Sequence, residues 1–461
     1  MRVAIAALLA FVLLGGNAAP SSATQPTAPP GMRALTVEEV QRGWKSLDAR
    51  QRGAVVEQLI AAGQFETAEQ MIADFGADTP VHRSTARFLT GVLRNAQGQR
   101  DEAIAIYREL LAANPEFARV RLLLAIALFQ KQEDDGARHH FELVMGSSTN
   151  TELHTTINRF VDQINQRKRL TFATHFSLVP STNYNQGTDT RVVTINGLDF
   201  QLDPNAVRHR GVGVASGFSA AYRAPVTDRL DFVVGGGAQS RVFRQSAFTD
   251  WTTVGELGPR YRFDWADIGL YGTASRRWLG GEDWYGGRTF SVNYGMRLHA
   301  RVRIDHSSII DTNFLCSEKR FDHQYWQDGW NCAVNAAMDH YFDSRTFFRL
   351  LGGVEHEVTG RPWLDYDAGN VGLGAYREIM HGLSVYGQVL YSRRVYGADF
   401  PVAGIPRVDN RMEGTVQVTK RDWYVKGLAP MLQYSYVRNF SNISFYDFDA
   451  HNLNLTLTRS F

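Results

Sequence analysis

The sequence predicts two joined domains of different classes: an α-helical repeat solenoid over residues 36–170, then a 14-stranded antiparallel transmembrane β-barrel over residues 171–461. Aromatic residues occupy 10 of the first 170 positions but 44 of the remaining 291. Apolar residues recur at helical spacing in the first part and at every second position in the second. After residue 14 no apolar run approaches the ~20 residues of a membrane-spanning helix, which excludes a polytopic helical membrane protein.

The overall charge is nearly balanced, with 49 basic and 47 acidic residues and a formal net charge of +2. Because nucleic-acid binding depends on a concentrated positive field, we expect no nucleic-acid partner. The mean hydropathy of −0.27 belongs to neither part of the chain alone.

Residues 1–23 are predicted to be a signal peptide. A positively charged start is followed by an apolar core at residues 3–14 and by small residues, with cleavage expected after residues 21–23 or, as an alternative, after residues 17–19. A buried N-terminal helix is the other interpretation of this segment. The features favour export from the cytoplasm.

Residues 24–35 carry three prolines and are predicted to be a flexible leader. The first cysteine of the chain is Cys316, so no lipid-attachment cysteine follows the signal. We therefore do not expect this protein to be a lipoprotein itself.

Residues 36–170 contain a repeat with a period of about 34 residues, in which a small residue is followed four positions later by a large one and then by proline. This is the tetratricopeptide pattern: small residues let two helices approach, the large residue fills the adjoining space, and proline ends the second helix. The predicted packing residues are Ala68, Ile72, Gly91, Ala103, Tyr107, Pro115, Ala125, Ala137 and Phe141.

Three repeat units are predicted, at residues 51–80, 83–115 and 117–148. A helix at 36–48 precedes them, and an amphipathic helix at 151–167 is expected to cap the array. An unrelated helical bundle is the alternative. Such a solenoid is expected to bind a peptide or partner rather than to catalyse a reaction.

From residue 171 onward the period is two. In residues 290–299 the even positions carry Phe, Val, Tyr, Met and Leu, and the odd positions carry Ser, Asn, Gly, Arg and His. A soluble β-sandwich also has one apolar face. These segments, however, are about 10–14 residues long, their aromatic residues cluster near segment ends, and their second face carries glycine and charge. We therefore predict strands that cross the outer membrane as a closed barrel with a wet lumen.

Fourteen such segments are predicted, an even number as in bacterial outer-membrane barrels. They are residues 171–180, 209–223, 230–243, 250–263, 266–278, 286–298, 300–312, 327–341, 345–358, 366–379, 383–395, 411–421, 428–440 and 447–461. Connections after even-numbered segments are short, and those after odd-numbered segments are mostly longer. Short turns face the periplasm, so both ends of the barrel and the repeat domain are expected on the periplasmic side.

The last segment ends in an apolar alternation, Leu453, Leu455, Leu457 and Phe461, although Arg459 interrupts it near the end. It is predicted to be the insertion signal read by the barrel-insertion machinery. The alternative is an ordinary final strand.

Cys316 and Cys332 are the only cysteines and are expected to form a disulfide, because exported cysteines usually pair. We place them beside an extracellular loop at residues 313–326. Closing about 17 residues would stabilise the fold by roughly 3 kcal/mol. Two thiols without nearby His or Asp make a poor metal site, and no metal or other cofactor is expected.

Polar residues on the second face of the strands are candidate lumen residues, and both signs of charge occur among them. They are Glu256, Arg260, Arg262, Arg277, Arg297, Arg301, Arg303, Asp305, Asp339, Arg349, Glu355, Glu357 and Glu413. They either form salt bridges that brace the wall or line a hydrated path for a polar or unfolded client. No G-x-S-x-G or H-E-x-x-H motif is present, so we do not expect an enzyme.

The order of signal peptide, short repeat array and 14-stranded barrel resembles the surface lipoprotein assembly modulator (Slam) family, the type XI secretion system. The resemblance includes the repeat pairs Ala68/Ile72, Ala103/Tyr107 and Ala137/Phe141, the barrel entry at residues 176–185, and the closing residues 457–461. It covers nearly all of the mature chain.

This resemblance implies an outer-membrane translocon that helps specific clients, lipoproteins or secreted soluble proteins, to reach the cell surface or the medium. Clients of the family are often proteins of iron or haem acquisition. No catalytic residue is implied. The implied partners are the client, outer-membrane lipid and the barrel-insertion machinery.

Two other functions are compatible with the domain order. An exopolysaccharide exporter of repeat-plus-barrel type usually carries a longer repeat array than the three units here. A small-solute porin or nutrient receptor would leave the repeats unexplained, and no plug domain precedes the barrel.

Overall fold

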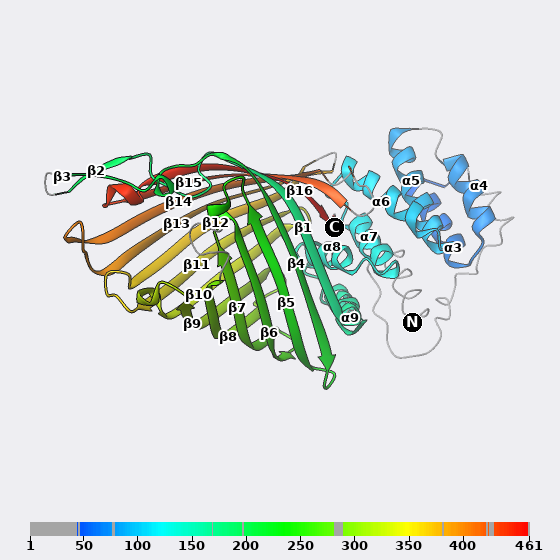
Figure 1. Ribbon diagram of the computed structural model, residues 1–461. Helices are drawn as coiled ribbons and strands as arrows, with labels where there is room; N and C mark the ends of the chain where they lie inside the picture. The colour runs from blue at the N-terminus through cyan, green and yellow to red at the C-terminus, as the bar shows by residue number, and fades with distance from the viewer. Residues whose placement is uncertain are drawn as a thin grey trace. The chain divides into compact units, whose positions relative to one another are not determined.

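The computed structural model describes residues 44, 47–75, 79–167, 169–195, 198–280, 289–379, 382–420, 423 and 428–459. The predicted signal peptide at 1–23 and leader at 24–35 lie outside these residues, as does most of the helix predicted at 36–48. The chain divides into two compact units, with the boundary between Val144 and Met145, and each unit is considered by itself (Figure 1).

Seven α-helices precede the barrel in the described part of the chain, and the first six form three consecutive pairs, which confirms the three predicted repeat units. The helices are α3 (Ala49–Ala61), α4 (Phe65–Phe75), α5 (Pro80–Ala96), α6 (Arg100–Ala113), α7 (Ala118–Gln130), α8 (Asp134–Gly146) and α9 (Thr151–Arg167). Among the described residues, none of these helices is both long and apolar enough to span a membrane.

The helix starts follow from local sequence. Asp48 accepts a hydrogen bond from the backbone N–H of Gln51 at 2.8 Å, and the Gln51 side chain accepts one from the Asp48 N–H at 3.0 Å, which forms a capping box for α3. Thr79 caps α5 in the same position, followed by Pro80, whose missing N–H costs nothing in the first turn.

Small and large residues pack in the repeat units as their spacing predicts. Ala68, Ala103 and Ala137 are fully buried. Tyr107 lies so close to Gly91 that a Cβ atom on this glycine would stand 2.7 Å from the tyrosine ring. The buried Arg121 of α7 donates a hydrogen bond to the carbonyl oxygen of Pro115 at 2.9 Å. The remaining packing residues, Ile72, Ala125 and Phe141, are buried as well.

Helix α9 groups with the barrel unit, Met145–Ser460. The ring of His154 on α9 stacks on that of His306, which lies between two barrel strands, with centroids 6.1 Å apart. Ile157 and Ile164 on the same helix are fully buried. The helix predicted to cap the repeat array is therefore held at one end of the barrel.

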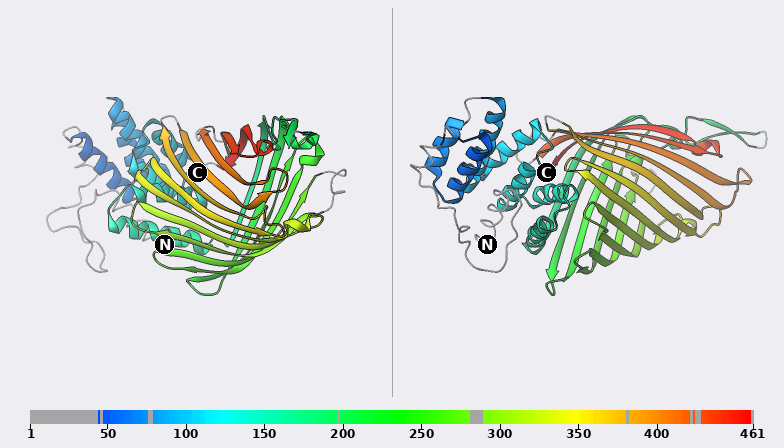
Figure 2. Two further views of the ribbon diagram at one scale, coloured as in Figure 1. Left: turned by 90° about the vertical axis from the view of Figure 1, so that its left-hand side faces the viewer. Right: turned by 180° about the vertical axis from the view of Figure 1, so that it is seen from behind.

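Fourteen strands form a closed antiparallel barrel, as predicted, and the order around it follows the sequence (Figure 2). The strands are β1 (Leu170–Ser181), β4 (Gly211–Pro225), β5 (Leu230–Val242), β6 (Asp250–Arg262), β7 (Ala266–Leu279), β8 (Thr289–Arg303), β9 (Ser308–Phe321), β10 (Gly329–Asp343), β11 (Thr346–Thr359), β12 (Tyr366–Ile379), β13 (Leu383–Phe400), β14 (Ile405–Lys420), β15 (Leu428–Ser441) and β16 (Phe448–Arg459). A two-stranded hairpin, β2 (Val192–Ile195) and β3 (Leu198–Gln201), lies in the first long connection.

Alternating side chains give the wall two faces. On β11 the outer face carries Phe348, Leu350 and Val354, the last of them 63% exposed. Glu355 and Glu357 lie on the other face. The exposed large apolar residues form the lipid-facing surface that a closed transmembrane barrel requires.

The turn between β8 and β9 lies at residues 304–307 and not at residue 299 as predicted. The carboxylate of Asp305 accepts hydrogen bonds from the Ser307 N–H at 2.7 Å and from the Ser308 hydroxyl at 3.1 Å, which defines the turn here. Arg301 and Arg303 therefore belong to β8, and Asp305 lies in the turn rather than on a strand.

Two predicted loops are shorter in the structure because the strands run on. β9 continues to Phe321, so the loop predicted at 313–326 is reduced to residues 322–328. Cys316 and Cys332 consequently lie in strands rather than beside a loop. β13 and β14 extend into the loop predicted at 396–410 and leave only residues 401–404 between them.

Connection lengths alternate around most of the barrel; the exceptions are the short connection 401–404 after β13 and the longer one 421–427 after β14. Connections after β4, β6, β8, β10 and β12 have two to four residues, whereas β1 and β4 are joined by residues 182–210. We refer to the two rims as the short-turn end and the long-loop end. Helix α9, through His154 and His306, meets the short-turn end.

The contact between Gly91 and Tyr107 predicts a contrast between two glycine-to-alanine substitutions. Gly91→Ala should lower the free energy of unfolding of the helical unit by about 1–3 kcal/mol, because the fully buried Tyr107 has no room to move. Gly53→Ala in α3 meets no atom within 4 Å and should stabilise it by about 0.5–1 kcal/mol. Thermal loss of helical circular dichroism measures both, and equal effects would contradict the packing described.

Candidate functional site

The inner face of the barrel carries ion pairs, most of them between neighbouring or next-but-one strands, whereas Arg411 pairs with Glu413 within β14. The predicted lumen residues take part as follows: Arg260 with Asp267, Arg262 with Asp231 at 3.6 Å, Arg277 with Asp250 at 2.6 Å, Arg297 with Glu256 at 2.5 Å, Arg349 with Asp339 at 2.6 Å, and Arg411 with Glu413 at 3.3 Å. Opposite charges thus compensate one another within the wall. These short-range pairs support the bracing interpretation left open by the sequence.

Arg301 and Arg303 lie near the end of β8. Arg301 is in register with Asp267 on β7 and with Asp311 on β9, so it has an acidic residue on each neighbouring strand. The acidic partners Asp231 and Asp267 were not predicted. Both residues lie on the same strand face as the arginines and next to a short turn. This position in the sequence pattern would have identified them as ion-pair partners.

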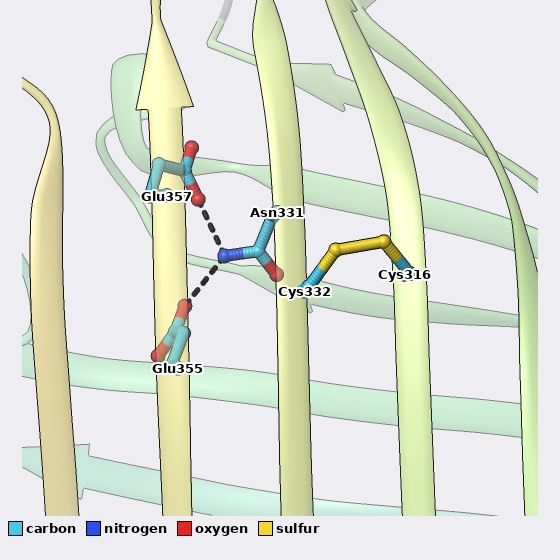
Figure 3. The surroundings of a disulfide bond; sticks show 5 residues. All are labelled: Cys316, Asn331, Cys332, Glu355 and Glu357. Atoms are coloured by element: carbon cyan, nitrogen blue, oxygen red, sulfur yellow. Dashed lines mark hydrogen bonds between the residues drawn. A yellow bond between two sulfur atoms is a disulfide. The ribbon is translucent and has the colours of Figure 1, made fainter.

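Glu355 and Glu357 are joined by an amide that the sequence analysis did not single out. The Asn331 side-chain amide donates to Glu355 at 2.8 Å and to Glu357 at 2.5 Å (Figure 3). Lys319 lies 2.6 Å from Glu357, and the Tyr366 hydroxyl donates to Glu355 at 2.6 Å. The two carboxylates are therefore satisfied by three side chains from three strands.

The predicted disulfide between Cys316 and Cys332 is present. The two cysteines are direct cross-strand partners on β9 and β10, with Cα atoms 4.0 Å apart. They lie on the same face as Phe314 and Val334, and Asn331, next in the chain, points to the opposite face. The bond therefore links two strands on the lipid-facing side of the wall (Figure 3).

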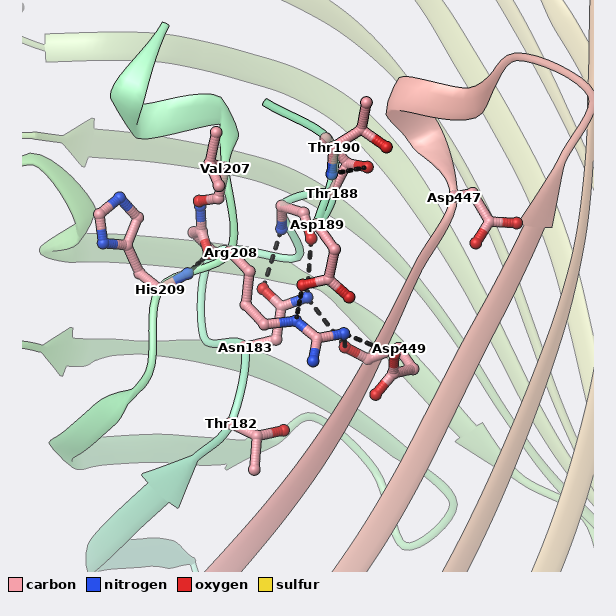
Figure 4. A network of polar contacts seen from close by, with 12 residues as sticks. Thr182, Asn183, Thr188, Asp189, Thr190, Val207, Arg208, His209, Asp447 and Asp449 are labelled. Atoms are coloured by element: carbon pink, nitrogen blue, oxygen red, sulfur yellow. Dashed lines mark hydrogen bonds and ion pairs between the residues drawn. The ribbon is translucent and has the colours of Figure 1, made fainter. Parts of the chain in front are cut away.

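At the long-loop end, the first connection is tied to the start of β16 by four residues, Asn183, Asp189, Arg208 and Asp449, which we call the clasp (Figure 4). The Asn183 amide donates to the backbone oxygens of Gly187 and Asp449, both at 2.8 Å. Arg208 bridges the carboxylates of Asp189 at 2.8 Å and Asp449 at 2.5 Å. The clasp therefore ties the connection that follows β1 to the last strand of the barrel.

The helical unit contains a cavity of about 460 Å³ between α3, α5 and α7. Val81, 72% exposed, and Phe117, 45% exposed, lie on its lining, which gives the cavity an apolar rim. Glu57 and Arg119 lie in it and form an ion pair at 2.7 Å. Burial raises the pKa of Glu57 above its usual value, and Arg119 only partly opposes this effect.

The predicted insertion signal is described only in part. Leu455 and Leu457 on β16 are exposed on the lipid-facing side, as is Leu453 to a lesser degree. Phe461 lies outside the described residues.

Comparison with known families agrees with this architecture. The family profile described as "Surface lipoprotein assembly modifier" matches residues 171–461, the whole barrel. The chain belongs to the surface lipoprotein assembly modifier family. A second profile, "Surface lipoprotein assembly modifier, N-terminal TPR repeats", matches residues 54–141 and confirms the predicted repeats. The resemblance inferred from the sequence is thereby confirmed, and the barrel is an outer-membrane barrel.

Curated relatives share the family name at low identity. Surface lipoprotein assembly modifier 1 of Haemophilus influenzae is 20% identical over 369 residues, which covers 79% of this chain and 75% of the relative. The surface lipoprotein assembly modifier of Pasteurella multocida is 22% identical over 402 residues, covering 81% and 76%. Among solved structures, the Pseudomonas putida toluene transporter TodX matches with a TM-score of 0.37 and 10% identity, covering 63% of this chain and 90% of TodX.

The clasp predicts that Arg208→Ala loosens the first long connection. Loss of two charge-assisted contacts should raise the opened fraction of residues 182–210 roughly tenfold. The rate of limited proteolysis in this segment of the purified barrel measures the change. The matched control is Arg210→Ala, an exposed arginine in the same connection, and an equal increase there would contradict the role of the clasp.

The raised pKa of Glu57 predicts a pH-dependent contribution to stability. A raised carboxyl pKa means that the folded state favours the neutral acid of Glu57. The contribution of Glu57 to folding stability is therefore fully present below the ordinary carboxyl pKa and is lost as pH rises through the pKa of the folded state. Glu57→Gln mimics the neutral acid. It should therefore match or exceed the parent at pH 7, and this difference should shrink as pH falls.

Arg119→Ala is the matching variant. It leaves the buried Glu57 carboxylate without its ion pair and should lower the free energy of unfolding by about 1–3 kcal/mol at pH 7. Melting followed by helical circular dichroism at pH 4.5 and 7 measures both variants. A Glu57→Gln variant that is less stable at pH 7 than Arg119→Ala would refute the dominance of desolvation.

Proposed function

We propose that this protein is an outer-membrane translocon that delivers client lipoproteins, or secreted soluble proteins, to the cell surface. The observation that carries the proposal is the family match over the whole barrel together with the match over the repeats, since the relatives bear the name of surface lipoprotein assembly modifiers. We further propose that the clients include proteins of iron or haem acquisition and that the chain has no enzymatic activity.

In this proposal the short-turn end faces the periplasm, because short turns do so in bacterial barrels. The helical unit precedes β1, whose first residue lies at that end, so it also lies in the periplasm. Outer-membrane lipid surrounds the wall, and the barrel-insertion machinery places the chain there.

The cavity between α3, α5 and α7 is proposed to receive a segment of the client. Its exposed apolar residues Val81 and Phe117 supply contact area, and the Glu57–Arg119 pair supplies polar anchoring. A cavity of about 460 Å³ accommodates a few side chains and not a folded domain. The client is therefore expected to arrive at least partly unfolded.

The braced inner wall suits passage of a polar chain. The charges on its inner face are compensated by neighbours, for example in the Arg349–Asp339 and Arg297–Glu256 pairs. A compensated surface holds a passing segment weakly, whereas a field of one sign would retain oppositely charged segments.

The test is deletion of the gene followed by protease shaving of intact cells and mass spectrometry of what is released. We expect individual lipoproteins to disappear from the surface while their total amount in the cell is unchanged, and the full chain supplied in trans to restore them. Val81→Asp should restore them several-fold less well if the cavity receives the client, with exposed Val226→Asp in the barrel unit as control.

Two results would contradict the proposal. If every surface protein stays in place while a polymer at the cell surface is lost, the protein exports polysaccharide. If only the uptake of a solute falls, it is a porin.

A further inference from the structure

The seam between β1 and β16 is unlike every other junction of the barrel. β1 pairs with β4 at twelve consecutive positions, from Leu170 to Ser181. It pairs with β16 at only three positions: Ser177 with Thr456, Leu178 with Leu455, and Ser181 with Asn452. Each of the other neighbouring strand pairs has eleven or more such positions between its described residues.

Apart from Val179 and Pro180, which lie within the paired part, the missing pairs lie toward the short-turn end. Residues 170–176 of β1 are exposed on both faces, whereas Ser177, Val179 and Ser181 are buried. The open segment therefore ends abruptly at Phe176, and the paired part begins at Ser177. It is not a ragged end beyond the wall, because β4 accompanies β1 along this whole segment.

β16 is long enough to continue the pairing but does not. Its residues continue to Arg459, and the register of the three existing pairs would set Leu457 opposite Phe176. Instead both side chains are 60% exposed. Two strand edges thus face the seam without pairing to each other.

The backbone groups left without a cross-strand partner can be identified. Just beyond the end of β1, the Thr182 N–H donates to the carbonyl oxygen of His451 in β16, and just before its start, the Arg169 carbonyl accepts from the Arg223 N–H of β4. Because successive residues of a strand direct their backbone groups to opposite neighbours, even-numbered residues of β1 face β16. Opposite the described residues of β16, the seam-facing groups of the open segment belong to Thr174 and Phe176; Leu170 and Phe172 lie beyond the described end of β16.

The opposite end of the same seam is fastened. Beyond Ser181, Thr182 and the clasp hold the first long connection to His451 and Asp449 (Figure 4). Pro180, which has no N–H, faces β16 within the paired part and reduces the hydrogen bonding there. The seam is therefore closed at the long-loop end and open toward the short-turn end.

Unpaired N–H and C=O groups in a membrane wall cost several kcal/mol each, and a strand edge is a template for an added strand. We propose, on the basis of the proposed function, that the β1 edge at residues 170–176 binds an extended segment of the client polypeptide by strand addition. Recognition through the backbone suits a translocon that handles clients of different sequence.

The side chains of the edge define the segment that fits. Phe172 and Phe176 face lipid, while Thr171, Ala173 and His175 face the lumen. An added strand matches this environment when apolar and small polar residues alternate along it. A client segment bound here would form part of the barrel wall. The open segment of β1 lies toward the short-turn end, which is the end that a client coming from the periplasm reaches first.

The first test asks whether the chain closes its own seam. Two cysteine pairs are introduced separately, L178C/L455C at a paired position and F176C/L457C at the unpaired one, and disulfides are mapped in isolated outer membranes of cells lacking the client. We expect the first pair to oxidise nearly completely and the second at least five-fold less. Equal oxidation would mean that the C-terminal strand pairs with the β1 edge, and would overturn the proposal.

The second test closes the seam in cells. F176C/L457C is cross-linked with a short bismaleimide, which spares the native cysteines because they form a disulfide. We expect surface display of the lipoprotein lost in the deletion strain to fall at least ten-fold. The control is L350C/L373C, cross-linked between the directly paired β11 and β12 positions, which should leave display unchanged.

The third test uses a single substitution and no cross-linking reagent. Thr174→Pro removes one seam-facing N–H and leaves the β4 ladder intact, so display should fall several-fold relative to Thr174→Ala. Heat-modifiable migration verifies that both barrels are folded. Full display from the closed or proline-bearing barrel refutes strand addition while the proposed function stands; failure of the unaltered chain to restore display refutes the proposed function instead.

Discussion

The requirement that every backbone N–H and C=O in a membrane wall finds a partner determines this structure. Thirteen of the fourteen strand junctions meet it with eleven or more register pairs, and the alternation of side chains on two faces follows from the same ladder. The junction of the two terminal strands meets it with three pairs. The least paired junction of the barrel is therefore the one between its first and last strands.

Charge compensation is the second regularity. Several arginines of the inner face pair with carboxylates one or two strands away, as in Arg349–Asp339 and Arg297–Glu256. The Glu355–Asn331–Glu357 group is completed by Lys319 and Tyr366. Such pairs connect strands by side chains in addition to backbone hydrogen bonds. Across the seam, the hydroxyl of Ser177 on β1 contacts that of Thr456 on β16.

Periodicity was sufficient to predict the repeats and the number of strands, because each of these depends on spacing alone. The turn between β8 and β9 was predicted at the wrong place. The alternation of apolar and polar residues continues through Arg301 and Arg303, so the position of the turn follows only from the hydrogen bonds that Asp305 accepts. The cysteines were paired correctly but assigned to a loop for the same reason. The partial pairing of β1 with β16 could not be predicted from the sequence, since it depends on how two strands that are far apart in the chain are aligned.

The disulfide has a consequence for the mechanics of the barrel. Counted around the wall from the seam, β1 and β4 to β9 form one half and β10 to β16 the other, with seven strands in each. The Cys316–Cys332 bond thus lies diametrically opposite the β1–β16 seam. A cylinder slit along one side bends most at the wall facing the slit. The Cys316–Cys332 bond lies on that line and covalently joins the two halves of seven strands each, so we expect it to limit how far β9 and β10 can separate when the seam widens.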